Sequence, residues 1–153
     1  MESKTPPPSY RLPAVLCFLL GFGHLFDLGV GLDLHRSFAW FAKLTATYGA
    51  WDPLYIAQPF YMKIISLLSG ALMMPMALAM GVGFLKRASW LKTLVIFYTG
   101  FITSSNIIWT WNEALAPVTP GSWAWAIGLS LPWWILPFWF TWLVHRPAQP
   151  PIA

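Results

Sequence analysis

The chain has 153 residues, of which 58% are hydrophobic, 18% aromatic and only 9% charged. Soluble domains carry about 25% charged residues, so most of this surface is not suited to water, and the length allows one domain. The basic residues that give the net charge of +4 are scattered, and their densest group is Lys86, Arg87 and Lys92. This distribution argues against nucleic-acid binding. Cys17 is the single cysteine, which excludes an intrachain disulfide.

Four apolar stretches are long enough to cross a bilayer core about 30 Å thick, which needs roughly 20 apolar residues per helix. They cover residues 12–31, 60–85, 90–111 and 123–144. The sequence therefore predicts an all-α fold: a polytopic four-transmembrane-helix bundle over residues 12–146. We expect a flexible N-terminal tail at 1–11 and a Pro-rich tail at 147–153.

The basic residues near the ends of these stretches predict an orientation. One side would hold Lys4, Arg11, Lys86, Arg87, Lys92 and Arg146, and the other Arg36, Lys43 and Lys63. The excess on the first side predicts that both termini are cytoplasmic. Composition does not distinguish the endoplasmic reticulum of a eukaryote from the inner membrane of a bacterium.

The loop between the first two stretches contains aromatic residues at helical spacing. The stripe consists of Phe38, Trp40, Phe41, Leu44 and Tyr48. It predicts a short helix lying at the membrane surface. Asp52 and Pro53 then predict a turn into the second stretch.

Several polar residues interrupt the apolar stretches, where an ionisable side chain costs at least about 2.5–3.5 kcal/mol. His24 and Asp27 are three residues apart and therefore share one face of a helix. That face would look into the bundle or a wet cavity, or Asp27 would lie near the helix end and bond a neighbouring helix. Asn106 either stabilises the packing of two helices through a hydrogen bond or is part of a site. Glu113 is either solvated or functional.

The last stretch combines aromatic residues with prolines. Trp133 and Trp134 lie too centrally to belong to an interfacial aromatic belt. We expect Pro132 and Pro137 to interrupt the helix around them and open space. Together with Met73 of the second stretch, these side chains would line a cavity for a bulky apolar ligand, or else pack helices and contact lipid.

Taken in order, motifs across residues 12–146 resemble those of the EXPERA family of membrane proteins, which includes a sterol double-bond isomerase and ligand-binding receptors. The motifs are Phe22-Gly23-His24-Leu25-Phe26-Asp27; Trp40-Phe41-Ala42-Lys43 followed by Asp52-Pro53-Leu54, Pro59 and Lys63; Asn106, Trp109 and Glu113; and Trp133-Trp134-Ile135-Leu136-Pro137. Two positions depart from the family pattern. Asp27 follows His24 by three residues instead of four, and Ser69 stands where an acidic residue is expected.

The resemblance implies a site in two parts. The catalytic group would be Asp27, His24 and Glu113. The ligand-binding group would be Asn106, Trp109, Ser69, Met73, Trp133 and Trp134. No metal or cofactor is expected.

The implied ligand is a small apolar molecule, a sterol or isoprenoid, and membrane lipids are a further expected partner. The implied chemistry is a double-bond shift, in which Asp27 and a second group donate and remove protons. A non-catalytic receptor for a sterol or cationic amphiphile, or a lipid-trafficking partner, is the alternative, which the loss of acid at Ser69 favours. A third interpretation is a structural protein that assembles through Ser66-x-x-x-Gly70. A homodimer is compatible with all three.

Overall fold

The computed structural model describes residues 8–115 and 123–146, and every regular element there is helical, as predicted. The elements are α1 (Pro8–Gly31), η1 (Leu34–Arg36), α2 (Ala39–Gly49), α3 (Leu54–Ala57), α4 (Phe60–Leu68), η2 (Ser69–Met73), α5 (Met74–Lys86), α6 (Leu91–Leu115) and α7 (Trp123–His145). The N-terminal boundary is corrected, because helix α1 already begins at Pro8 within the predicted tail 1–11. The tail 147–153 lies outside the described residues.

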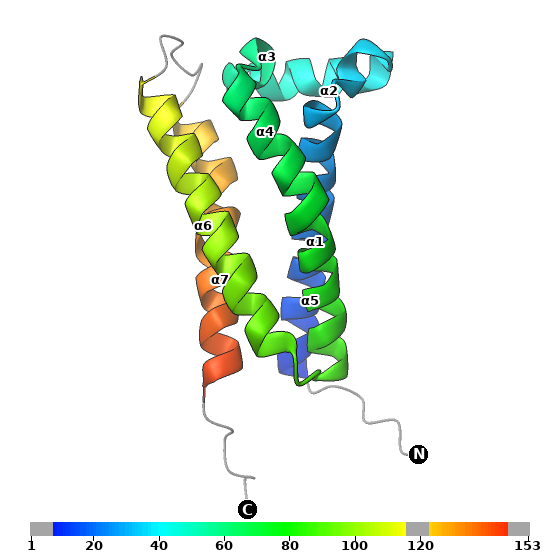
Figure 1. Cartoon of the computed structure of the whole chain (residues 1–153), viewed down its shortest axis with the longest axis vertical. Coiled ribbons are helices and arrows are strands. Elements are labelled where there is room, and N and C mark those ends of the chain that lie inside the picture. Colours follow the sequence, from blue (N-terminus) through cyan, green and yellow to red (C-terminus); the bar gives the residue numbers. More distant parts are fainter. Residues whose placement is uncertain (1–7, 116–122, 147–153) are drawn as a thin grey trace, which may run out of the picture.

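Three helical segments are long and apolar enough to cross a membrane. They are Tyr10–Gly31, Phe60–Lys86 and Leu91–Asn112. The second of these is continuous through α4, η2 and α5. The fourth predicted stretch is helical as α7, which runs beside α6 (Figure 1).

The helices form two pairs that meet at one end of the bundle. Helix α1 packs chiefly against α4, η2 and α5, and α6 packs chiefly against α7 (Figure 1). The two pairs are joined where α5 contacts α6, around a buried core that includes Cys17, Ala77, Tyr98 and Phe140. At the other end α2 lies across the end of α1 and reaches α3 (Figure 1).

Glycines bring α1 close to the second segment. A Cβ atom at Gly70 would lie 2.2 Å from Leu28 Cβ, and one at Gly21 would lie 2.7 Å from a methyl carbon of Leu78. Small residues allow this close packing, which is one of the interactions that associate helices in lipid. The Ser66-x-x-x-Gly70 pattern therefore contributes its glycine to packing within the chain.

The first loop forms the predicted short helix, α2, and the predicted turn. The Asp52 carboxylate accepts a hydrogen bond from the Leu54 backbone N–H at 3.1 Å, and α3 begins at that residue. Across the same end, Lys63 Nζ donates to Asp33 Oδ2 at 2.7 Å. These contacts hold the loop over the bundle.

The prediction that Pro132 and Pro137 interrupt the last helix is wrong, since α7 continues through both. Pro137 has no N–H for the carbonyl of Trp133, four residues earlier. The side chain of Asn106 on α6 donates to that carbonyl instead, at 3.0 Å. A neighbouring helix thus replaces the missing backbone donor, which is how prolines are tolerated inside membrane helices.

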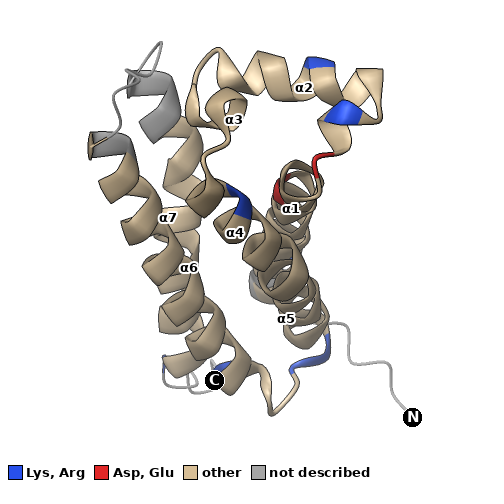
Figure 2. Ribbon diagram, turned by 45° about the horizontal axis from the view of Figure 1, so that its top comes forward, with Lys and Arg blue, Asp and Glu red and all other residues tan. Residues whose placement is uncertain are grey.

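Lys and Arg residues in the described part of the chain gather towards the two ends of the bundle (Figure 2). One group is Lys86, Arg87 and Lys92, around the α5–α6 connection, and the other includes Arg36 and Lys43. The middle of the bundle is left to apolar side chains and a few buried polar ones, which is the distribution that a membrane environment requires.

Candidate functional site

A cavity of about 370 Å³ lies between the two helix pairs, in the half of the bundle covered by α2 and α3. This volume falls within the roughly 300–1,000 Å³ of small-molecule sites. Its lining comes from α1, α2, α3, α4, η2, α6 and α7: Gly23, His24, Phe26, Asp27, Leu44, Tyr48, Tyr55, Met62, Ile65, Ser66, Ser69, Met73, Ile102, Ser105, Asn106, Trp109, Leu129, Ser130 and Trp133. Among these described residues there is one carboxylate and no Lys or Arg.

The carboxylate is that of Asp27, four residues before the end of α1. Its side chain is 20% exposed and points into the cavity. Tyr55 of α3 donates its hydroxyl to Oδ1 at 3.1 Å, and Ser69 of η2 donates to Oδ2 at 2.7 Å. Hydrogen bonds to a charged group contribute about 1.5–3 kcal/mol each, so this pair offsets much of the cost of an acid at this depth.

His24 lies one turn before Asp27 on the same face of α1, as their spacing predicts. Its Nδ1 is 2.7 Å from Ser69 Oγ, and its Nε2 is 2.8 Å from the Tyr98 hydroxyl of α6. The imidazole is fully buried. Both ring nitrogens are therefore occupied by hydroxyl groups from two other segments, and this fixes the orientation of the ring.

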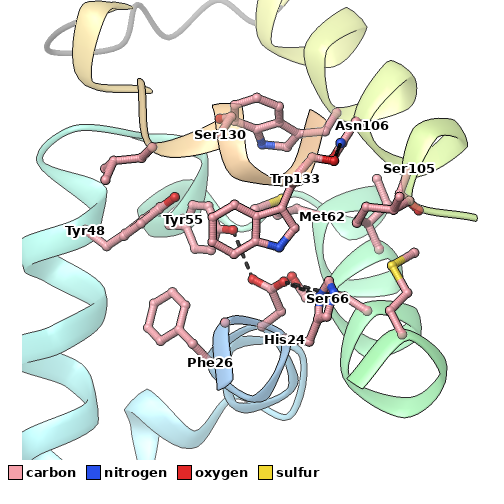
Figure 3. Close-up of a pocket in the computed structure, with 18 of the residues that line it drawn as sticks. His24, Phe26, Tyr48, Tyr55, Met62, Ser66, Ser105, Asn106, Ser130 and Trp133 are labelled. Atoms are coloured by element: carbon pink, nitrogen blue, oxygen red, sulfur yellow. Dashed lines mark hydrogen bonds and ion pairs between the residues drawn. The ribbon is translucent and has the colours of Figure 1, made fainter. Parts of the chain in front are cut away.

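Aromatic and small polar side chains surround the acid. Tyr48 and Phe26 lie on one side of the carboxyl group, and Ser66 lies on the other (Figure 3). Burial, and then the negative charge of Asp27, raises the pKa of Tyr55 well above its ordinary value of 10.0. Tyr55 therefore stays protonated and acts as a donor to the acid.

The opposite wall of the cavity is set by α6 and α7. Asn106 lines the cavity and fixes the backbone of Trp133 through the hydrogen bond described above. The Trp133 ring lies against the bare backbone of Gly23, where a Cβ atom would come 2.5 Å from the ring. Trp133 also borders a second hollow of about 540 Å³ between α1 and α7.

One polar atom at this wall lacks a partner. The Trp109 indole Nε1 is buried and has no hydrogen-bond acceptor among the described residues. Trp109 lines the cavity, and a buried donor without an acceptor costs about 1–3 kcal/mol. A ligand atom that accepts a hydrogen bond would remove this cost.

Most of the predicted site residues come together here. Those that line the cavity are His24, Asp27, Ser69, Met73, Asn106, Trp109 and Trp133. Trp134 is not among the residues that line it, whereas its neighbour Trp133 is. The side chain of Glu113 lies outside the described residues.

The prediction missed several residues of the site. Tyr98 could have been noticed by the same reasoning as His24, because its hydroxyl lies in an apolar stretch and needs a partner. Tyr55 had no such signal, since a tyrosine in an aromatic loop is unremarkable. Tyr48 was assigned to the membrane surface and also borders the cavity.

Comparisons with protein-family models, curated proteins and solved structures return no match to this chain.

Proposed function

We propose that this chain is an EXPERA-like membrane protein that binds a sterol- or isoprenoid-like ligand in the cavity beside Asp27 and shifts a double bond of that ligand. The observation that carries the proposal is the direction of the Asp27 carboxyl, which faces an aromatic-lined cavity inside the bundle. An acid in such a site can contact a bound ligand, whereas an acid that faces lipid or bulk water cannot.

The proposal includes α7 as a fourth transmembrane helix. This helix has 23 residues, contains no Asp, Glu, Lys or Arg, and lies beside α6. Helix α1 begins and α7 ends at the same end of the bundle, as an even number of crossings requires (Figure 1). The basic residues at that end favour cytoplasmic termini, and the family resemblance favours the endoplasmic reticulum.

The ligand would be an apolar molecule with one polar group. Met62, Met73 and Ile102 offer apolar surface to its body. The Trp109 indole Nε1, which has no acceptor among the described residues, would donate to an oxygen of that polar group, and Asp27 would face the double bond. An apolar pocket with a few convergent polar groups is the usual form of a small-molecule site.

In its protonated form Asp27 can carry out both halves of a double-bond shift. The acid gives its proton to one alkene carbon, which forms a C–H bond and leaves a carbocation on the neighbouring carbon. The resulting carboxylate removes a proton from a carbon adjacent to the cation, and the electrons of that C–H bond form the new double bond. Asp27 ends protonated, as it began. A nearby aromatic face such as that of Trp133 stabilises the cation by about 2 kcal/mol when water is excluded.

The test is turnover of an isomerisable sterol or isoprenoid by purified wild type and Asp27→Asn. General acid–base catalysis contributes roughly 10²–10⁴-fold, so we expect at least about a hundredfold loss in the variant. Asp33→Asn is the matched control, because it makes the same replacement outside the cavity lining and should retain turnover. Equal turnover by wild type and Asp27→Asn would overturn the proposal.

A second candidate function is binding without catalysis. It is favoured by the presence of a single carboxylate among the described cavity residues, since the family resemblance leads us to expect two. Mass spectrometry of ligands that co-purify with the protein separates the two functions. A bound ligand whose double bond is not moved on incubation supports the receptor.

A further inference from the structure

One hydroxyl group connects the histidine of the site to its acid. His24 Nδ1 and Asp27 Oδ2 are 3.8 Å apart, beyond the roughly 2.7–3.2 Å of a hydrogen bond. Ser69 Oγ lies 2.7 Å from each of these two atoms. The connection between the two titratable groups therefore runs through Ser69.

The position of this hydroxyl depends on an irregular piece of helix. Ser69 begins η2, a single π-helical segment that precedes Pro75, and such segments occur frequently at functional sites. The next residue, Gly70, packs directly against Leu28, the neighbour of Asp27. Because Gly70 has no side chain, η2 approaches α1 closely enough for Ser69 to reach both partners.

The hydrogen-bond chain is shielded from bulk water along most of its length. His24 and Tyr98 are fully buried, and Ser69 is 4% exposed. His24, Ser69 and Asp27 all border the cavity, and Asp27, whose side chain is 20% exposed, is the most open of the three. A proton moving between His24 and Asp27 therefore has a direct path through the serine hydroxyl, which can accept and donate at once.

We propose that Ser69 is a proton relay that loads Asp27 from His24, and the catalytic use of this relay rests on the proposed function. In the first state His24 carries protons on both ring nitrogens, its Nδ1–H donates to Ser69, and the serine hydroxyl donates to ionised Asp27. The Nδ1 proton moves to Oγ while the hydroxyl proton moves to Oδ2. One N–H and one O–H bond break and two O–H bonds form. The products are neutral His24, an intact serine and protonated Asp27.

Tyr98 is a positioning residue at the far end of this chain. Its hydroxyl lies 2.8 Å from His24 Nε2, and its ring meets the imidazole edge to face with centroids 5.9 Å apart. The hydroxyl can donate to Nε2 or accept from it, so it serves His24 in either protonation state. It thereby keeps Nδ1 aimed at Ser69 during the transfer.

The relay is tested by nuclear magnetic resonance without any ligand. The ring ¹⁵N shifts of His24 are recorded in lipid nanodiscs for wild type, Asp27→Asn, Ser69→Ala and the double variant. We expect Asp27→Asn to change the His24 shifts more when Ser69 is present than when alanine replaces it, because only a through-space effect across 3.8 Å remains without the hydroxyl. Ser69→Thr keeps the hydroxyl and should preserve the response. Ser69→Cys, a weaker donor of similar size, replaces the alanine variant if that variant does not fold.

The same response to Asp27→Asn with and without the hydroxyl would overturn the relay, whatever the protein binds. If the response of the His24 shifts to Asp27→Asn is reduced in Ser69→Ala, and the wild-type protein turns over no sterol or isoprenoid, the relay would be supported and the isomerase proposal contradicted.

Discussion

The hydrogen bond from Asn106 to the Trp133 carbonyl should be needed only because residue 137 is proline. In a regular helix the N–H of residue 137 would bond the carbonyl of residue 133, and proline cannot supply it. Asn106→Leu removes the substitute donor and leaves a partly buried carbonyl unpaired. Pro137→Ala restores the backbone donor.

The size of the effect follows from the contacts. Interhelical hydrogen bonds in membrane proteins contribute about 0.6 kcal/mol on average and up to about 1.7 kcal/mol, and an unpaired buried group costs about 1–3 kcal/mol. We therefore expect Asn106→Leu to lower the free energy of unfolding by about 1–2 kcal/mol in the wild type. In the Pro137→Ala background the loss should fall to about 0.5 kcal/mol or less, which gives a coupling energy near 1 kcal/mol.

The measurement is reversible unfolding in mixed detergent micelles, followed by circular dichroism, for wild type, both single variants and the double variant. Ser104→Ala is the control, because that hydroxyl bonds the Gly100 carbonyl of its own helix at 2.9 Å and should change stability by no more than about 0.5 kcal/mol. If Asn106→Leu costs the same with proline or alanine at position 137, the proposed replacement of the backbone donor is wrong.

Two further predictions concern packing and pH. Gly70→Ala should destabilise by about 1–3 kcal/mol in the same unfolding assay, because its Cβ would lie 2.2 Å from Leu28 Cβ, whereas Gly100→Ala, with no atom within 4 Å, should stabilise by about 0.5–1 kcal/mol. Equal effects of the two substitutions on the free energy of unfolding would contradict the close approach of η2 to α1 at Gly70. The hydrogen bond from Lys63 lowers the pKa of Asp33 below its ordinary value of 3.8, so their pairing should stabilise the fold above that pH and be lost as the pH falls through the lowered pKa. Lys63→Met should reduce this loss of stability at acid pH. A loss as large as in the wild type would mean that other titratable groups cause it.

The helical architecture could be predicted because the determinants are local. Length and hydropathy indicated three of the membrane-length helices, and an aromatic stripe indicated α2. The shared face of His24 and Asp27 also follows from spacing alone, since residues three apart lie on one side of a helix. The start of α1 was placed too late, because the run Pro6-Pro7-Pro8 was assigned to the tail although proline is common in the first turn of a helix.

The details of the site depend on contacts between helices, which spacing does not reveal. Ser69 was noted as the place of a missing acid, yet its bridging position requires the π-helical turn and the contact of Gly70 with α1. The expected interruption of α7 failed because Asn106, on another helix, satisfies the carbonyl that Pro137 leaves unpaired. Trp134 was grouped with its neighbour, but only Trp133 lines the cavity, and the sequence does not show which of two adjacent helical residues faces it.

The central claim is that an apolar ligand occupies the cavity beside Asp27. A photoactivatable diazirine sterol or isoprenoid alcohol, cross-linked to the protein in membranes and mapped by mass spectrometry, tests this most directly. We predict adducts on cavity residues such as Met62, Met73 and Ser105, reduced by an excess of unlabelled ligand. Adducts confined to outward-facing residues such as Phe22 and Ile96, with no effect of the competitor, would mean that the probe merely dissolves in the surrounding lipid.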